Sequence, residues 1–471
     1  MRTATTRIGT SPGLRNDRGG ASRSNVLVVY ETVWCQITNP AMTGKTLAKS
    51  AGAKMQPDAK CHADTGKSVA STPTNSITSA ETARIIRLFG LGLLLRMVLL
   101  LAFHFTGVEQ TLVLSKDAAL YDQMGKQIAE YYRTGGATAW PAHVTGTLDH
   151  LYEHVVGVTY YLTGNSILAI RLINAICGSL VILTTWRMAR YLTDARTAFY
   201  ASLGACFLPT LVYYSCLPIL DAQSTCAMSL VFLGMTAMTS SGKRRHMLAL
   251  PIGLLLTAGF RSYVAFVLLF LIPASWLVTI LATKSRHEFR PAYRCMLVAI
   301  LVMAAIGPPA VAEMYSNSKV KRATNVTSWN GIRKKMNSGR GAIYEKGSVP
   351  GIGESSLETV KSVATGLYFF VVSINPTKMG SIRQWMALPE VLLVLFMSPK
   401  ILRGFCTIMR DYRFEYLSVV LVALALTIAY STVTTNAGPL MRWRLQVASV
   451  YITLAAVGFA NPEKKQLIND Q

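Results

Sequence analysis

Residues 246–283 read HMLALPIGLLLTAGFRSYVAFVLLFLIPASWLVTILAT and contain one charged side chain, that of Arg261. A helix that crosses a membrane needs about 20 mostly apolar residues. The run is therefore long enough for two helices, which we place at 246–260 and 262–283. Arg261 then stands where one helix ends and the next begins. This pattern predicts a helical membrane protein rather than a soluble domain.

The composition of the whole chain agrees with this interpretation. Only 15% of the 471 residues are charged and 51% are hydrophobic, whereas soluble domains average about 25% charged residues. Lys and Arg outnumber Asp and Glu by 47 to 23, giving a formal charge of +24. Soluble nucleic-acid-binding proteins are also basic, but they lack apolar runs of this length. The same numbers exclude a collagen, a disulfide scaffold and a wholly disordered chain.

Apolar segments recur along the chain and predict an all-α, polytopic membrane protein with about ten spans. We place the spans at 88–104, 166–186, 197–217, 220–240, 246–260, 262–283, 295–315, 384–400, 416–435 and 442–460. Arg96 interrupts the first of these. A charge at the bilayer centre costs roughly 3 kcal/mol on insertion scales, so we favour an interfacial helix followed by a span that begins near Met97. The apolar segment 363–374 is too short to span and is predicted to be re-entrant or interfacial.

The ends and loops of the chain set its predicted orientation. Residues 1–82 are rich in Ser, Thr, Gly, Ala and Lys and predict a disordered, basic, cytoplasmic tail; the true start of the chain stays open. With this tail inside, four loops and the C-terminal tail that fall on the cytoplasmic side are basic, as the positive-inside rule expects. The membrane domain then covers 83–461. Its external loops lie at about 107–165 and 316–383, and a short cytoplasmic tail follows at 462–471.

Five charged residues collect at the predicted external face: Asp117, Asp221, Arg261, Arg442 and Arg444. Acids and arginines that meet at one membrane face indicate a substrate or active site. Transfer of a sugar from a lipid phosphate needs a carboxylate to accept a proton and arginines to hold the phosphate. We predict Asp117 as this base and the arginines as phosphate ligands. Helix capping by the acids and snorkelling of the arginines are the structural alternatives.

A series of short motifs carries a family resemblance. They are Asp117-Ala-Ala-Leu-Tyr121, Val158-Thr-Tyr-Tyr-Leu-Thr-Gly164, Ala169-Ile-Arg-Leu-Ile-Asn174, Ala189-Arg-Tyr-Leu192, Leu208-Pro-Thr-Leu-Val-Tyr-Tyr-Ser215, and Asn436…Gly438…Arg442. In this order they resemble the GT-C membrane glycosyltransferases, in the protein-mannosyltransferase and aminoarabinose-transferase branch. The resemblance implies an inverting transferase that uses a polyprenyl-phosphate-linked sugar at the outer face. It also implies a catalytic Asp117. Ala118 stands where family members often carry a second acid, so either this branch differs or the site uses Asp221 as its second catalytic carboxylate, which is our prediction.

The remaining site predictions concern aromatic and metal-binding residues. We expect Tyr121, Tyr152 and Tyr263 to bind substrate together with Arg261, Arg442 and Arg444. A cluster in the first external loop (His143, Asp149, His150, Glu153, His154) matches no metal-binding spacing, so no metal site is predicted. No cofactor is required, and the sequence leaves a divalent cation open.

The predicted partners are the polyprenyl-phosphate sugar donor, the membrane, and a glycan, lipid or protein acceptor, with no nucleic acid. The predicted location is a bacterial plasma membrane with a cytoplasmic N-terminus, and an ER membrane is the alternative. Two other functions stay open. One is a transporter or flippase for lipid-linked saccharides, and the other is a non-catalytic scaffold of the cell envelope.

Overall fold

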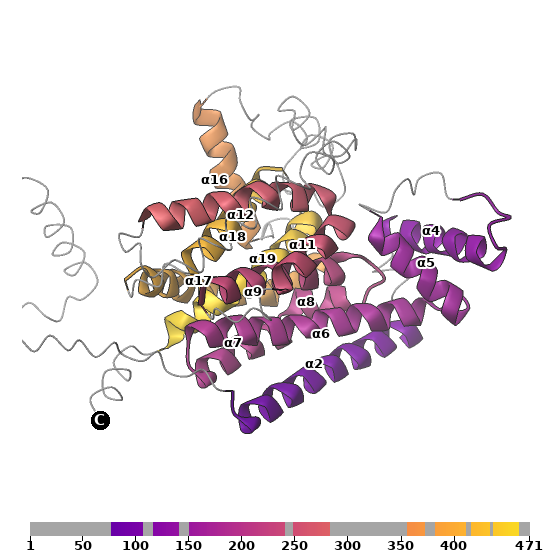
Figure 1. Cartoon of the computed structure of the whole chain (residues 1–471), viewed down its shortest axis with the longest axis horizontal. Coiled ribbons are helices and arrows are strands. Elements are labelled where there is room, and N and C mark those ends of the chain that lie inside the picture. The colour runs from indigo at the N-terminus through magenta and orange to yellow at the C-terminus, as the bar shows by residue number, and fades with distance from the viewer. Residues whose placement is uncertain are drawn as a thin grey trace, which may run out of the picture. The chain divides into compact units, whose positions relative to one another are not determined.

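The computed structural model describes most of the predicted membrane domain. The described residues are 77–106, 116–140, 150–240, 248–282, 356–372, 382–410, 416–433 and 437–460. The predicted N-terminal tail up to residue 76, the predicted span 295–315, most of the loop 316–383 and residues 461–471 lie outside them. Within the described residues every regular element is an α-helix (Figure 1), which confirms the predicted all-α class for this part of the chain.

The described helices run in this order along the chain. They are α2 (Ser79–Thr106), α4 (Lys116–Arg133), α5 (Leu151–Thr163), α6 (Ile167–Leu192), α7 (Ala195–Phe207), α8 (Pro209–Ser215), α9 (Asp221–Ser240), α11 (Ala249–Phe260), α12 (Ser262–Ala282), α16 (Ser356–Val372), α17 (Ile382–Arg410), α18 (Leu417–Val433) and α19 (Ala437–Phe459). Within the described ranges, four segments are long and apolar enough to cross a membrane: Ser79–Thr106, Ile167–Leu192, Ser262–Leu281 and Leu388–Arg410. The predicted number of ten spans therefore stays a prediction.

Two predicted helix boundaries were wrong. Helix α2 is continuous through Arg96, whose side chain is fully buried, so no separate interfacial helix ends there. The predicted span 197–217 is instead two helices, α7 and α8, because Pro209 supplies no backbone N–H to continue α7. The Arg96 guanidinium donates to Gly92 O at 2.9 Å and to Cys206 O, at the end of α7, at 3.5 Å. Backbone carbonyls inside the bundle thus lower the cost of burying this charge.

Other boundaries moved by up to three turns. Helix α17 continues to Arg410, through ten residues that we assigned to a cytoplasmic loop. The segment 363–374 largely belongs to α16, which packs against α18. Helix α19 begins at Ala437, so Arg442 and Arg444 lie inside the helix rather than at its start.

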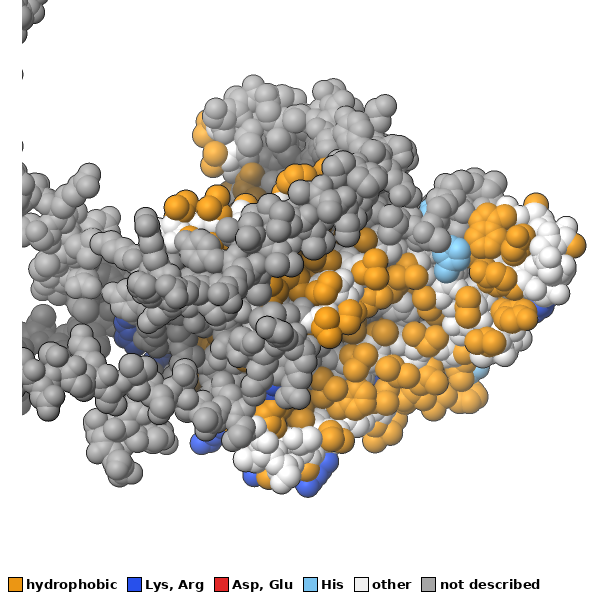
Figure 2. Space-filling model, viewed as in Figure 1, with side chains coloured by type: hydrophobic (Ala, Val, Ile, Leu, Met, Phe, Trp, Pro, Cys, Tyr) orange, Lys and Arg blue, Asp and Glu red, His pale blue; other side chains and the backbone are white. Residues whose placement is uncertain are grey.

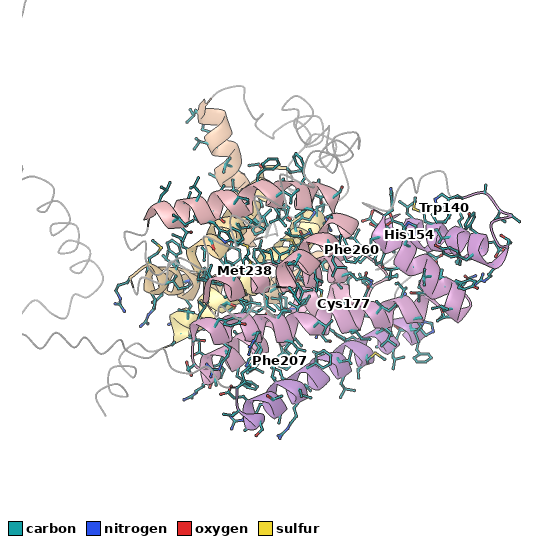
Figure 3. All side chains as sticks on the ribbon, viewed as in Figure 1. Trp140, His154, Cys177, Phe207, Met238 and Phe260 are labelled. Carbon is teal, nitrogen blue, oxygen red and sulfur yellow. The ribbon has the colours of Figure 1, made fainter. Side chains whose placement is uncertain are left out.

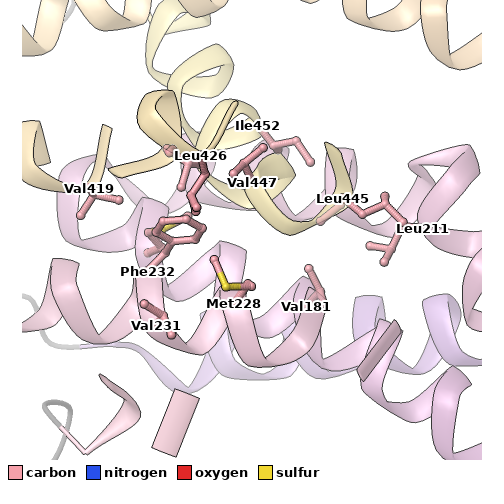
Figure 4. Close-up of a cluster of buried hydrophobic side chains, with 14 of the residues drawn as sticks. Val181, Leu211, Met228, Val231, Phe232, Val419, Leu426, Leu445, Val447 and Ile452 are labelled. Atoms are coloured by element: carbon pink, nitrogen blue, oxygen red, sulfur yellow. The ribbon is translucent and has the colours of Figure 1, made fainter. Parts of the chain in front are cut away.

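Helix α19 occupies the centre of the helical packing and contacts α6, α7, α8, α9, α16, α17 and α18. Figure 4 shows the core that it forms with α6, α8, α9 and α18, where Phe232, Leu426 and Val447 are fully buried or nearly so. Helices α17 and α19 approach closely at Gly404 and Gly458. A Cβ on either glycine would collide with a backbone carbonyl of the other helix. Glycine at both positions is therefore a condition of this packing.

Large apolar side chains also cover much of the outside of the bundle. Leu94, Leu255, Leu281 and Phe396 are exposed on four different helices, and Figure 2 shows hydrophobic side chains spread widely over the described surface. Patches of this extent are uncommon on soluble monomers. They fit helices that face lipid.

Helices α4 and α5 form a hairpin from the predicted first external loop. The Val156 side chain packs on the backbone at Gly125, and the Ile128 side chain packs on the backbone at Gly157, so the two helices approach closely. The Tyr160 hydroxyl donates to Asp122 Oδ1 at 2.7 Å. Figure 3 shows Trp140 and His154 of this hairpin side by side; their rings stack with centroids 5.5 Å apart.

Candidate active site

Four charged side chains meet near the ends of five helices. Asp117 lies in the first turn of α4, and Asp221 is the first residue of α9. Arg261 is the single residue between α11 and α12. Arg442 lies in the second turn of α19. The structure thus brings together residues that are up to 325 positions apart in the chain.

The four side chains form one continuous chain of ion pairs. Arg442 Nη1 donates to Asp117 Oδ2 at 2.5 Å, and Arg442 Nε lies 3.6 Å from Asp221 Oδ2. The other oxygen of Asp221 accepts from Arg261 Nη2 at 2.6 Å. Arg442 therefore bridges the two acids, and Asp221 bridges the two arginines.

The two carboxylates differ sharply in their surroundings. The Asp117 side chain is 48% exposed, whereas that of Asp221 is 1% exposed. A carboxylate buried between two guanidinium groups is shielded from an incoming hydroxyl. An exposed carboxylate with one arginine partner can reach solvent or substrate. Asp117 is therefore the better placed of the two to exchange a proton.

Arg261 owes its position to the break between two apolar helices. Its N–H still donates to Thr257 O of α11, while its carbonyl accepts from Val264 N of α12. Nη1 donates to the Tyr263 hydroxyl at 2.8 Å. The guanidinium is thus held between Asp221 and Tyr263.

Asn174 of α6 holds the turn that leads into Asp221. Its Nδ2 donates to Leu217 O at 2.6 Å and to Ile219 O at 2.9 Å, and its Oδ1 accepts from Gln223 Nε2 at 2.9 Å. Asn174 was predicted only as part of a motif, with no role of its own. Its spacing three residues after Arg171, on a buried helix face, was the available signal.

The predicted tyrosines lie beside this group. Tyr121 and Tyr152 contact each other edge to face with ring centroids 4.7 Å apart. Burial, followed by the nearby carboxylates of Glu153 and Asp221, raises the pKa of Tyr121, so its hydroxyl stays protonated and can donate a hydrogen bond. Burial likewise raises the pKa of Tyr152, whose hydroxyl accepts from Asn174. Tyr214 of α8, which we did not predict, lies under the Arg442 guanidinium at 5.9 Å.

Arg444 lies apart from this group and has other partners. Its Nη2 donates to Glu390 Oε1 at 2.5 Å, and its Nη1 donates to Val371 O at 3.0 Å. Both charged side chains are buried. The structure therefore gives Arg444 a different environment from that of Arg261 and Arg442.

The two described histidines of the first external loop, His150 and His154, contact residues of the α4–α5 hairpin. His150 Nδ1 lies 3.3 Å from Glu153 Oε1, and burial lowers the pKa of His154, which stacks on Trp140. No group of three potential metal-ligating side chains occurs among the described residues. His143 and Asp149 lie outside those residues, and a divalent cation remains an open prediction.

Comparison with known proteins adds a family match to this geometry. Residues 151–311 match the family model described as dolichyl-phosphate-mannose-protein mannosyltransferase. This part of the chain is therefore similar to that family of membrane glycosyltransferases. The match confirms the resemblance that the motifs predicted, and it contains Asp221 and Arg261 of the site. A search of curated proteins found no significant match.

Two solved structures are similar to the chain. Both are crystal structures of ArnT from Cupriavidus metallidurans, one bound to undecaprenyl phosphate and one in the apo state. They are 19% identical to this chain, with TM-scores of 0.49 and 0.47. The alignments cover 83% of this chain but only 62% and 63% of the ArnT chains, so this chain spans less than two thirds of their length.

Proposed function

We propose that the protein transfers a sugar from a polyprenyl-phosphate-linked donor to an acceptor hydroxyl, with inversion at the anomeric carbon. One observation carries this proposal: a half-exposed carboxylate, Asp117, is held by an arginine that shares a buried carboxylate with a second arginine. The arrangement combines a proton acceptor with two cations. These are the groups that a displacement of lipid phosphate by a hydroxyl needs.

Asp117 is the general base of the proposed reaction. The acceptor oxygen attacks the anomeric carbon and forms the new glycosidic bond as its proton passes to the Asp117 carboxylate. The bond between the anomeric carbon and the phosphate oxygen breaks, and its electron pair leaves with the lipid phosphate. Asp117 needs no activation by a cofactor, because it accepts a single proton and makes no covalent bond.

Arg442 and Arg261 stabilise the charge that builds on the leaving phosphate. Guanidinium groups bind phosphate oxygens in a fixed planar geometry, and preorganised cations contribute most where water is excluded. Asp221 has a supporting role in this scheme. Its two oxygens are engaged by the two arginines, so it orients both guanidinium groups toward one place.

The orientation of α6 supports a site on the outer face. Asn174, which holds the turn before Asp221, lies near the beginning of this helix. Arg187 and Arg190 lie near its other end, about 20 Å farther along a helix that rises 1.5 Å per residue. Lys and Arg favour the cytoplasmic ends of spans, so the site lies at the opposite end.

Donor turnover tests the proposal. Purified full-length protein in nanodiscs is given a panel of radiolabelled polyprenyl-phosphate sugars, and release of free polyprenyl phosphate is measured. We expect Asp117→Asn to lower release by roughly 100-fold to 10,000-fold, the usual contribution of a general base. Asp122→Asn is the matched control, because this acid is on the same helix and pairs with Lys126 at 2.7 Å.

Two results would count against the proposal. Turnover by Asp117→Asn at the rate of the control would remove Asp117 from the chemistry. Absence of both turnover and binding of undecaprenyl phosphate, the lipid in one of the similar ArnT structures, would favour the transporter or scaffold instead.

A further inference from the structure

Two buried charged side chains, those of Glu390 and Arg444, meet helix ends that lie inside the bundle. Glu390 Oε2 accepts from Thr210 N, in the first turn of α8, at 2.8 Å. Arg444 Nη1 donates to the carbonyls of Phe370 and Val371, at the end of α16. The helix dipole places positive charge at helix beginnings and negative charge at helix ends, so each of these side chains has the sign that its helix end prefers.

The break between α7 and α8 uses a charge on each side. An uninterrupted helix would pair Cys206 O with the N–H of Thr210. Here Arg96 donates to the carbonyl at 3.5 Å, and Glu390 accepts from the N–H. Arg96 on α2 and Glu390 on α17 thus fix the two halves of an interrupted helix.

Glu390 also connects this break to α19. Its second oxygen accepts from Arg444 Nη2 at 2.5 Å, and its side chain is only 1% exposed. Arg444 follows Arg442 by two residues on α19. Tyr214, over which the Arg442 guanidinium lies, belongs to α8. The Glu390 carboxylate therefore binds both α19, which carries Arg442, and α8, which carries Tyr214.

We propose that Glu390 is a positioning residue for Arg442. The inference rests on the proposed function, because it assigns Arg442 to the phosphate of the donor. Glu390 pairs with Arg444 and Thr210, not with Asp117 or Arg442. It acts by fixing α8 and α19, through Thr210 N and Arg444, so that the Arg442 guanidinium faces Asp117 and Asp221.

Stability alone gives a weak reason for this buried ion pair. Replacing a buried ion pair with well-packed apolar groups is often neutral or stabilising. A charge that fixes the orientation of two helices can instead contribute to the reaction rate, because a displacement of about 1 Å at a reacting group can cost about 100-fold in rate.

A double-mutant cycle separates positioning from a general structural effect. The full-length variants Glu390→Gln, Arg442→Lys and the double variant are compared with the wild-type protein for donor turnover. Rates are normalised to the number of undecaprenyl-phosphate sites, so that unfolded protein does not count. Glu81→Gln is the matched control, because it breaks another ion pair between helices, with Arg190 at 3.4 Å, in the first turn of α2.

The expected loss for Glu390→Gln is about tenfold to 100-fold in kcat. The loss should nearly disappear in the Arg442→Lys background, because that variant already lacks the guanidinium that Glu390 positions. Additive losses, or equal losses in Glu390→Gln and Glu81→Gln, would overturn the proposal.

Hydrogen exchange provides a readout that does not depend on turnover. In Glu390→Ala we expect faster exchange in α8 and in the first two turns of α19, while Glu81→Gln leaves both segments unchanged. If the wild-type protein turns over no donor, the proposed function fails. Hydrogen exchange still tests whether Glu390 fixes α8 and α19. Unchanged exchange in either segment would overturn this. If Glu390→Ala does not fold, Glu390→Gln is measured in its place, and the same criterion applies to α19.

Discussion

Arg442→Lys tests the bridge between the two carboxylates. The guanidinium uses two different nitrogens, Nη1 for Asp117 at 2.5 Å and Nε for Asp221 at 3.6 Å, and lies over the Tyr214 ring. Lysine keeps the charge but concentrates it on one ammonium, which cannot reproduce this geometry. Losing one hydrogen bond to a charged group costs about 1.5–3 kcal/mol. At tenfold for each 1.36 kcal/mol, kcat/KM should fall roughly tenfold to 150-fold.

The assay is release of polyprenyl phosphate from a labelled donor, with thermal unfolding measured on the same preparations. Arg403→Lys is the control, because Arg403 is an exposed residue of α17 and the substitution is chemically identical. We expect the control to keep wild-type kcat/KM. If Arg442→Lys also keeps it, charge alone suffices and the bridging geometry has no catalytic importance.

Three further predictions concern the residues that build the site. Asp221→Asn should lower stability by about 3–5 kcal/mol, because the buried Arg261 and the partly buried Arg442 lose their shared carboxylate; a thermal shift in detergent measures this, and added undecaprenyl phosphate should restore part of it, since the phosphate replaces the missing anion. Asn174→Leu should lower stability by about 1–3 kcal/mol for each buried carbonyl that it leaves unpaired, Leu217 O and Ile219 O; an unfolding midpoint equal to that of the wild-type protein would contradict this. Gly458→Ala should cost about 1–3 kcal/mol, because its Cβ would meet Lys400 O. Gly90→Ala, where a Cβ meets nothing within 4 Å, should be neutral or stabilising in the same melt.

Hydrophobic pattern predicted the helices well where one long apolar run forms one helix. The run 262–283 became α12, and 220–240 became α9, within one residue at each end. The pattern failed where tertiary contacts replace the usual backbone pairing. Arg96 looked too costly for a span, since a sequence cannot show that Cys206 O, freed by the break before Pro209, would lie beside it. Pro209 was the signal for that break.

The site was predicted in its residue types but not in its pairing. Topology and motif resemblance placed Asp117, Asp221, Arg261 and Arg442 at one face, and the structure brings these four together. Arg444 looked equivalent to Arg442 because the two are neighbours in sequence. Two residues along a helix turn a side chain by about 200°, so Arg444 faces Glu390 instead. Glu390 itself is a single acid in an apolar segment, and only the folded chain shows what it binds.

A structure of the full-length protein with undecaprenyl phosphate bound tests the central claim most directly, and cryo-electron microscopy in nanodiscs is the suitable method. We predict that phosphate oxygens lie within hydrogen-bonding distance, about 2.7–3.2 Å, of Arg261 and Arg442, with Asp117 on the open side of the phosphate. A phosphate bound instead near Arg187 and Arg190, with Arg442 still paired to both carboxylates, would contradict the account.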